Sequence, residues 1–181
     1  MISGPALVLG DDVNTDELHP SRFYSLDDAT VRAGFLGAVG PEKRGIRTPS
    51  LASPRGSAAE EVPVGPVVVA GANFGVGSSR ETGARVFLLA GVRAIVARSF
   101  ARIFFRNASN LGIPVFVCPE LVAPAPGDVV LVDLERGEVR CGGRTFPIAP
   151  PDAYWAAVCA AGGLARYLGL EPVAAGDRAA S

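Results

Sequence analysis

The chain has 181 residues, 49% of them hydrophobic and 19% charged, so it can bury a core, and general disorder is excluded. A net charge of -1 excludes a field strong enough to recruit nucleic acid or an acidic membrane. The first residues lack the basic and apolar regions of a secretion signal. No apolar run reaches the length of about 18 residues that a helix needs to span a bilayer. We therefore expect a cytoplasmic protein with no nucleic-acid or membrane partner.

Cysteine spacing bears on metal binding and on the redox compartment. The three cysteines, Cys118, Cys141 and Cys159, lie far apart and form no CxxC pair. This spacing predicts no metal or iron–sulfur site within the chain itself. An odd number of unpaired cysteines also favours a reducing, cytosolic compartment.

The amino-terminal segment predicts a strand, a polar loop and a short helix. An apolar run over residues 6–9 predicts a strand. Residues 11–20 are dense in side chains that bond to nearby backbone, which predicts a tight, ordered loop rather than a regular element. A short helix is expected over residues 26–37, beginning near Asp27 or Asp28.

A proline-rich stretch separates this segment from the remainder of the chain. Residues 40–66 hold four prolines before position 64 and many small side chains, which predicts a flexible surface loop. The strand before it is too small to form a domain alone. We therefore expect one domain over residues 1–171, followed by a short tail over residues 172–181.

The centre of the chain alternates short apolar runs with longer amphipathic stretches. The predicted strands span residues 67–70, 93–97 and 113–117, and the predicted helices span residues 78–90 and 100–111. Short connections between them predict parallel strands joined by right-handed crossovers. A hairpin and a final helix are predicted at residues 129–133, 138–141 and 151–161.

A glycine-rich turn is the strongest candidate for a functional site. Residues 71–82 read GANFGVGSSRET, and Gly75 and Gly77 allow positive φ and close approach of a ligand. Ser78 would begin a helix, whose free N–H groups attract an anion. Arg80 adds a planar fork for a carboxylate, and the Ser78 and Ser79 hydroxyls share the same space. The pattern predicts a carboxylate pocket.

A purely structural interpretation of the same residues stays open. Ser78 followed by Glu81 fits the capping box S-x-x-E, which needs no ligand. The glycine spacing differs from the dinucleotide fingerprint and lacks the lysine of a P-loop, so nucleotide binding is disfavoured.

Several separate motifs resemble one known family. NFGVGSSRE, GVRAIVARSFARIFFRNASNLGIPVF, GDDVNTDELHP and CAAGGLARYL stand in the order found in the small subunit of 3-isopropylmalate dehydratase, which is similar to the swivelling domain of aconitase. The likeness covers most of the chain outside residues 40–66 and beyond about residue 171. It implies an α/β fold in which a mixed sheet curves into a barrel-like core with flanking helices.

The resemblance also implies an activity and residue roles. Ser78 takes the position of the serine that removes a proton next to a carboxylate, and Arg80 that of the arginine that grips this carboxylate. Ser79 lies beside them as a donor, while Thr15 and Asp16 line or brace the substrate entrance. The implied enzyme is a hydro-lyase that interconverts 3- and 2-isopropylmalate in leucine biosynthesis. Its four-iron four-sulfur cluster would sit on a partner, the large subunit.

Two departures from the family pattern concern packing and substrate choice. Val76 and Thr82 stand where a cysteine and a histidine are familiar, and we interpret both as packing changes. The resemblance implies that the loop after Pro20, which reads SRFYS here, selects the substrate side group. Its candidate contacts with the substrate are Arg22, Phe23, Tyr24 and Ser25. A homoaconitate- or methylmalate-type substrate and a non-catalytic anion-binding module therefore stay open as alternatives.

Two further features allow more than one interpretation. His19, the one histidine, has no partner at metal-binding spacing, so a local hydrogen bond is favoured over catalysis. Arg98, Arg102 and Arg106 repeat every four residues. They form either a solvated stripe on a helix or a docking surface for the large subunit.

Overall fold

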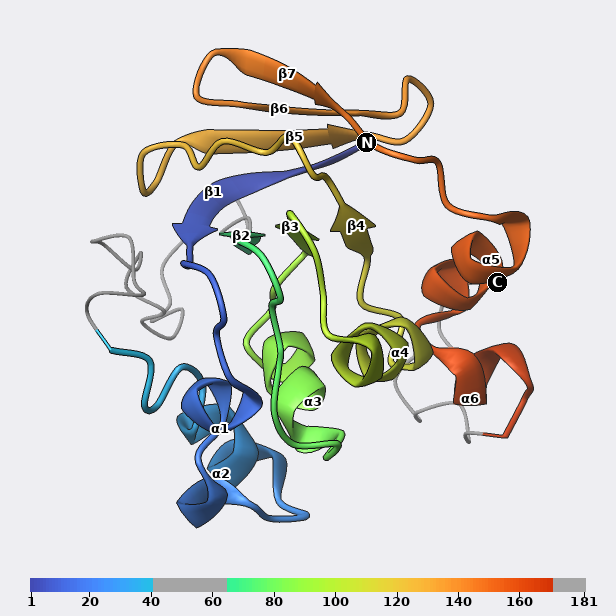
Figure 1. Ribbon diagram of the computed structural model, residues 1–181. Helices are drawn as coiled ribbons and strands as arrows, with labels where there is room; N and C mark the ends of the chain where they lie inside the picture. The colour runs from blue at the N-terminus through green and yellow to red at the C-terminus, as the bar shows by residue number, and fades with distance from the viewer. Residues whose placement is uncertain (41–64, 171–181) are drawn as a thin grey trace, which may run out of the picture.

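A seven-stranded mixed sheet organises the computed structural model, which describes residues 1–40 and 65–170. Its strands, in the spatial order β4-β3-β2-β1-β5-β6-β7, are β1 Ile2–Val8, β2 Val67–Ala70, β3 Ala94–Ala97, β4 Val115–Val117, β5 Val129–Asp133, β6 Glu138–Cys141 and β7 Arg144–Pro147. The first four strands pair in parallel, and β5, β6 and β7 pair antiparallel. The sheet curls into a half-barrel (Figure 1), so the predicted α/β fold with a curved mixed sheet is confirmed.

Helices gather mainly below the parallel half of this sheet (Figure 1). They are α1 Thr15–Leu18, α2 Asp28–Ala33, α3 Thr82–Leu89, α4 Arg102–Asn110, α5 Ala153–Ala161 and α6 Leu164–Tyr167, with a short 3-10 turn at Ser21–Phe23. The layer of β5, β6 and β7 lies on the other side of the parallel strands. Among the described residues, no helix is both long and apolar enough to cross a bilayer.

Apolar side chains fill both sides of the parallel strands. Alternate residues of a strand face opposite sides, so Leu7 and Val68 pack toward the helices while Ala6 and Val67 pack into the half-barrel. Every residue of β2 and β3 is buried, which explains their unbroken apolar sequences VVVA and AIVA. This two-sided burial fixes the carboxyl ends of the parallel strands, from which the site loops leave.

The predicted strands 67–70, 129–133 and 138–141 are confirmed residue for residue, whereas other boundaries differ. The helix predicted from Ser78 begins at Thr82, so that start was wrong by one helical turn. Within the predicted loop 11–20 the chain forms the one-turn helix α1, capped reciprocally by Asn14 and Glu17. The short elements β7 and α6 were not predicted.

Two predictions fall mainly outside the described residues. They are the flexible loop over residues 40–66, of which 41–64 lie outside, and the tail over residues 172–181. The domain limits at residues 1–171 therefore stay a prediction.

Candidate active site

The glycine turn carries the chain from β2 to α3 and needs glycine at two positions. Gly75 has φ +80° and Gly77 has φ +113°, both in the region that favours glycine. A Cβ at Gly75 would overlap the ring of Phe104, and a Cβ at Gly77 would overlap the side-chain amide of Asn14. The turn is thus pressed between α4 and the loop that follows β1.

Replacing Gly75 with alanine should lower the free energy of unfolding by about 3 kcal/mol, because left-handed strain and overpacking add. Gly91 is a matched control, since it has φ +73° but no atom within 4 Å of an added Cβ. Gly91→Ala should cost only about 1 kcal/mol, from strain alone. Urea unfolding of the two variants measures the difference, and equal losses would contradict the packing argument.

Thr15 anchors the turn just before the two serines. Its Oγ1 accepts a hydrogen bond from the Ser78 N–H at 2.7 Å, and its own N–H donates to the Val76 carbonyl at 2.8 Å. The Thr15 side chain is buried, with 3% of the residue exposed. Thr15 therefore links the loop after β1 to the loop after β2, through its hydrogen bonds to Val76 and Ser78.

Ser78 and Arg80 lie together and point toward one another. The Arg80 backbone N–H and its Nη1 both reach Ser78 Oγ, at 3.3 Å and 3.4 Å. Neighbouring Ser79 is exposed, and its backbone carbonyl accepts from Asn107 Nδ2 of α4 at 3.1 Å. Asn107 was missed at the sequence level, because an asparagine within a helix carries no signal of a distant partner. Two N–H groups directed at one hydroxyl oxygen favour negative charge on it.

The capping alternative for Ser78 is wrong. Helix α3 begins at Thr82, its N-cap is Glu81, and no side chain caps it. Ser78 and Arg80 therefore precede the first turn rather than occupying it, so the dipole argument made from the sequence applies more weakly than expected. The Ser78 hydroxyl is left to interact with Arg80.

Tyr24 joins Arg80 to Asp16. Its hydroxyl accepts from Arg80 Nη1 at 2.9 Å and donates to Asp16 Oδ1 at 3.0 Å. The guanidinium carbon also lies 4.6 Å from the centre of the tyrosine ring. Burial raises the pKa of Tyr24, so the phenol keeps its proton at neutral pH and remains a donor to Asp16.

The other three candidate side-group residues make their polar contacts nearby. Arg22 Nη2 donates to the Gly37 carbonyl at 3.2 Å, and its guanidinium lies over the ring of Phe23. Ser25 Oγ accepts from the Asp27 N–H at 3.0 Å. Within the described part of the chain, these hydrogen bonds stay in this segment and do not reach Ser78 or Arg80.

His19 is a buried core residue, so the prediction of a local hydrogen bond is confirmed. No part of it is exposed, and its Nε2 lies 3.1 Å from the Val31 carbonyl, which requires the proton on Nε2. Its ring stacks on Tyr24 with centroids 5.4 Å apart. Burial lowers the pKa of His19 from its ordinary value of 6.5.

Stability should depend on pH through His19. Because its pKa is lower folded than unfolded, the unfolded chain binds the proton first as pH falls. The contribution of His19 to the free energy of unfolding is therefore complete above about pH 6.5, and it declines as pH falls toward the pKa of the folded state. His19→Gln, which keeps a donor for Val31, should flatten this slope in urea titrations between about pH 7.5 and 5.5. An unchanged slope would assign it to other groups.

Three arginines surround the start of α4 on its exposed side. Arg102 and Arg106, with the glycine turn, line a hollow of about 490 Å³. Arg98 lies 3.9 Å from Asp11, and α4 buries Phe104 on its opposite face. The stripe is therefore exposed and adjoins the turn, which is compatible with both interpretations made from the sequence.

The cysteines do not fit an iron–sulfur cluster. Cys118 and Cys141 are buried, and burial raises the pKa of Cys118 and of half-buried Cys159 to about 11, which opposes the thiolate that a cluster needs. Over residues 1–40 and 65–170, no three His, Cys, Asp or Glu side chains gather as metal ligands.

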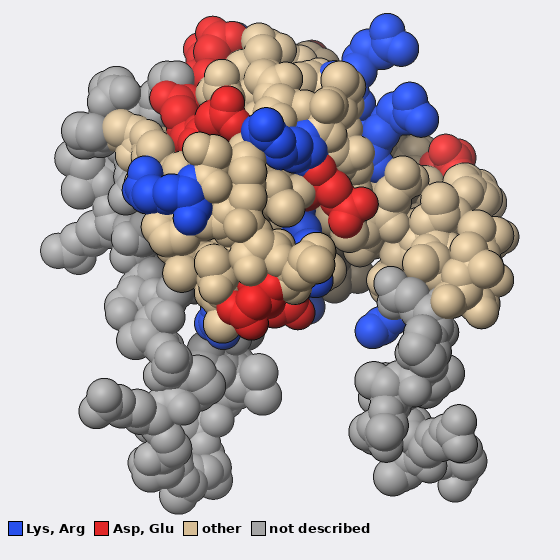
Figure 2. All heavy atoms as spheres, turned by 90° about the horizontal axis from the view of Figure 1, so that it is seen from below, with Lys and Arg blue, Asp and Glu red and all other residues tan. Residues whose placement is uncertain are grey.

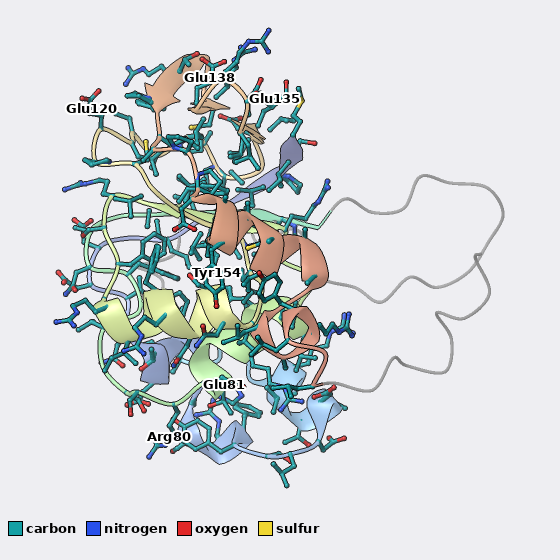
Figure 3. The ribbon with its side chains drawn as sticks, turned by 90° about the vertical axis from the view of Figure 1, so that its right-hand side faces the viewer. Arg80, Glu81, Glu120, Glu135, Glu138 and Tyr154 are labelled. Atoms are coloured by element: carbon teal, nitrogen blue, oxygen red, sulfur yellow. The ribbon has the colours of Figure 1, made fainter. Side chains whose placement is uncertain are left out.

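The candidate site lies far from the antiparallel strands. Figure 3 places Arg80 and Glu81 at one end of the molecule and Glu135 and Glu138 at the other. The site end, viewed from below in Figure 2, carries acidic and basic side chains interspersed. A single-sign surface does not form there, so recognition depends on individual groups such as Arg80.

A curled mixed sheet that brings a serine and an arginine together on a glycine turn defines an aconitase-type swivelling domain. In agreement, the family described as Aconitase C-terminal domain matches residues 59–118. A relative from Moorella thermoacetica, named 3-isopropylmalate dehydratase small subunit, is 38% identical over 171 residues. The match covers 93% of this chain and 95% of the relative. The relative of the same name from Heliobacterium modesticaldum is 37% identical, covering 92% and 93%.

A solved structure agrees with these relatives. The crystal structure of 3-isopropylmalate dehydratase from Methanocaldococcus jannaschii superimposes with a TM-score of 0.74 at 32% identity, covering 93% of both chains. The present chain belongs to the 3-isopropylmalate dehydratase small subunit family.

Proposed function

We propose that this chain is the substrate-gripping subunit of a hydro-lyase that interconverts 3- and 2-isopropylmalate in leucine biosynthesis. The observation that carries the proposal is the contact between Arg80 and Ser78, in which two N–H groups converge on one hydroxyl. Family membership supports the same substrate class, because relatives are named for this dehydratase.

Arg80 would hold a carboxylate of the substrate. Of its five N–H donors, the two on Nη1 face Tyr24 and Ser78. Among the described residues, Nε and Nη2 have no hydrogen-bond partner. Their shared edge presents two parallel N–H groups, which match the two oxygens of a carboxylate.

Ser78 would act as the base. Its alkoxide removes the proton from the carbon next to the bound carboxylate, the C–H electron pair forms the double bond, and the hydroxyl leaves the neighbouring carbon. Rehydration with the opposite regiochemistry returns the proton and completes the isomerisation. A serine hydroxyl is a weak base, so the donors from Arg80 and the exclusion of water must favour its alkoxide.

A separate large subunit would complete the enzyme. When present there, a four-iron four-sulfur cluster would supply the Lewis acid for the departing hydroxyl. The small-subunit name of the relatives supports such a partner, which must cover the face that carries Ser78. We place the pair in the cytoplasm and treat residues 1–171 as one domain.

Reconstitution tests this function. The chain is co-expressed with a large subunit of the family, the cluster is rebuilt anaerobically, and 2-isopropylmalate, 3-isopropylmalate, homoaconitate and methylmalate are compared. We expect the isopropylmalates to have the highest kcat/KM. Because Arg22 Nη2 donates to the Gly37 carbonyl, the Arg22 side chain is not directed at an extra carboxylate in this arrangement. Binding of the acids without turnover would favour the non-catalytic module.

A further inference from the structure

The hydrogen bonds from Asp16 through Tyr24 to Arg80 cross between two loops that are remote in sequence. Tyr24 and Arg80 are 56 residues apart, yet their side chains meet at 2.9 Å. We infer that Tyr24 is a positioning residue that holds Nη1 of Arg80 and so keeps the Nε–Nη2 edge free for the substrate carboxylate. This inference rests on the proposed function and adds a residue that acts through Arg80.

The bonding capacity of the tyrosine hydroxyl supports this role. Its one hydrogen goes to Asp16 and its oxygen accepts from Arg80. The guanidinium also lies over the ring, at 4.6 Å from its centre. A hydroxyl already bonded on both sides is poorly suited to be the first contact of a substrate side group. Tyr24 is therefore better placed to orient Arg80 than to select the substrate directly.

Tyr24 is itself held in place from two sides. Its ring stacks on His19, which is fully buried and bonded to Val31. Asp16 is fixed at the start of α1, where its N–H donates to Asn14 Oδ1 at 2.8 Å. An exposed arginine has many rotamers, and holding one N–H group against a fixed partner removes much of that freedom before the substrate arrives.

The first test observes the guanidinium without any partner or substrate. In ¹⁵N NMR spectra of the full chain, restricted rotation should give Arg80 separate Nη signals, which are assigned by their loss in Arg80→Lys. Tyr24→Phe keeps the ring but removes the hydroxyl, and should merge these signals by faster rotation. The control is Tyr154→Phe on α5, remote from Arg80 in Figure 3, which should leave them unchanged. Merged signals in the wild type, or no effect of Tyr24→Phe, would overturn the inference.

The second test asks whether Tyr24 acts through Arg80. In the reconstituted pair, Tyr24→Phe should raise KM for 2-isopropylmalate about tenfold, as expected for one bond to a charged group, and change kcat less. In an Arg80→Lys background the same substitution should change KM less than about twofold. Equal increases in both backgrounds would show that Tyr24 acts independently of Arg80 and overturn the inference. If the wild-type pair turns over none of the acids, the proposed function fails, and the NMR result alone decides the role of Tyr24.

Discussion

Replacing Ser78 with alanine should lower kcat of the reconstituted enzyme by about 10² to 10⁴-fold, the usual contribution of a positioned base. KM should change little, because Arg80 keeps its free edge for the carboxylate. Folding should be retained as well, since the bond from this position to Thr15 uses the backbone N–H and survives in alanine. Steady-state rates and urea unfolding of the same preparations measure the two effects.

Ser79→Ala is the matched control for this substitution. Ser79 is the adjacent exposed serine, and its described contact uses its backbone carbonyl, which alanine retains. We therefore expect a much smaller loss of kcat. Equal turnover by Ser78→Ala and the wild type would remove Ser78 from the mechanism, and an equal loss in both variants would assign the effect to the turn as a whole.

Replacing Arg80 with lysine should raise KM by about 10- to 100-fold, from the loss of one or more hydrogen bonds to a charged group. Lysine retains the positive charge but presents it at a single point, so it cannot hold two carboxylate oxygens side by side. Its ammonium has one nitrogen in place of three, so it cannot bond Tyr24 and Ser78 as Nη1 does and also present a separate pair of N–H groups to the substrate. Initial-rate kinetics over a wide range of 2-isopropylmalate concentrations measure the effect.

Arg85→Lys is the control for Arg80→Lys. It shows whether the rise in KM is specific to Arg80 or follows from replacing any arginine on or near α3. Arg85 pairs with Asp28 at 2.5 Å and so joins α3 to α2. That substitution should leave KM unchanged. If Arg80→Lys also leaves KM unchanged, the free edge of Arg80 does not hold the substrate.

Local sequence patterns predicted the parallel core well, because burial on both faces forces an unbroken apolar run such as Val67–Ala70. They failed where contacts remote in sequence determine the conformation. The backbone at Ser78 bonds to Thr15, 63 residues earlier, and the Ser79 carbonyl bonds to Asn107, 28 residues later. These contacts hold the serines in a turn where the local pattern predicts a helix.

The candidate site was predicted in part. Resemblance identified Ser78, Arg80, Asp16 and Tyr24 as candidates, and the structure joins them in one hydrogen-bonded group, in which Tyr24 contacts Arg80 and Asp16. The direction of Arg22 was not predictable, because either an inward or an outward side chain satisfies the same sequence. The direction of the Arg22 side chain is set by its hydrogen bond to the Gly37 carbonyl, which forms only in the folded loop. Element β7 was missed because its four residues, ending in Pro147, carry a weak strand signal.

The bond between Thr15 and the amide at position 78 has an evolutionary consequence. Every amino acid except proline supplies that amide, so the link between the turn and Thr15 does not depend on the hydroxyl oxygen to which we assign the chemistry. Under the proposed roles of Ser78 and Arg80, a duplicated gene is therefore a single codon change away from a chain that still folds and captures acids but no longer transforms them.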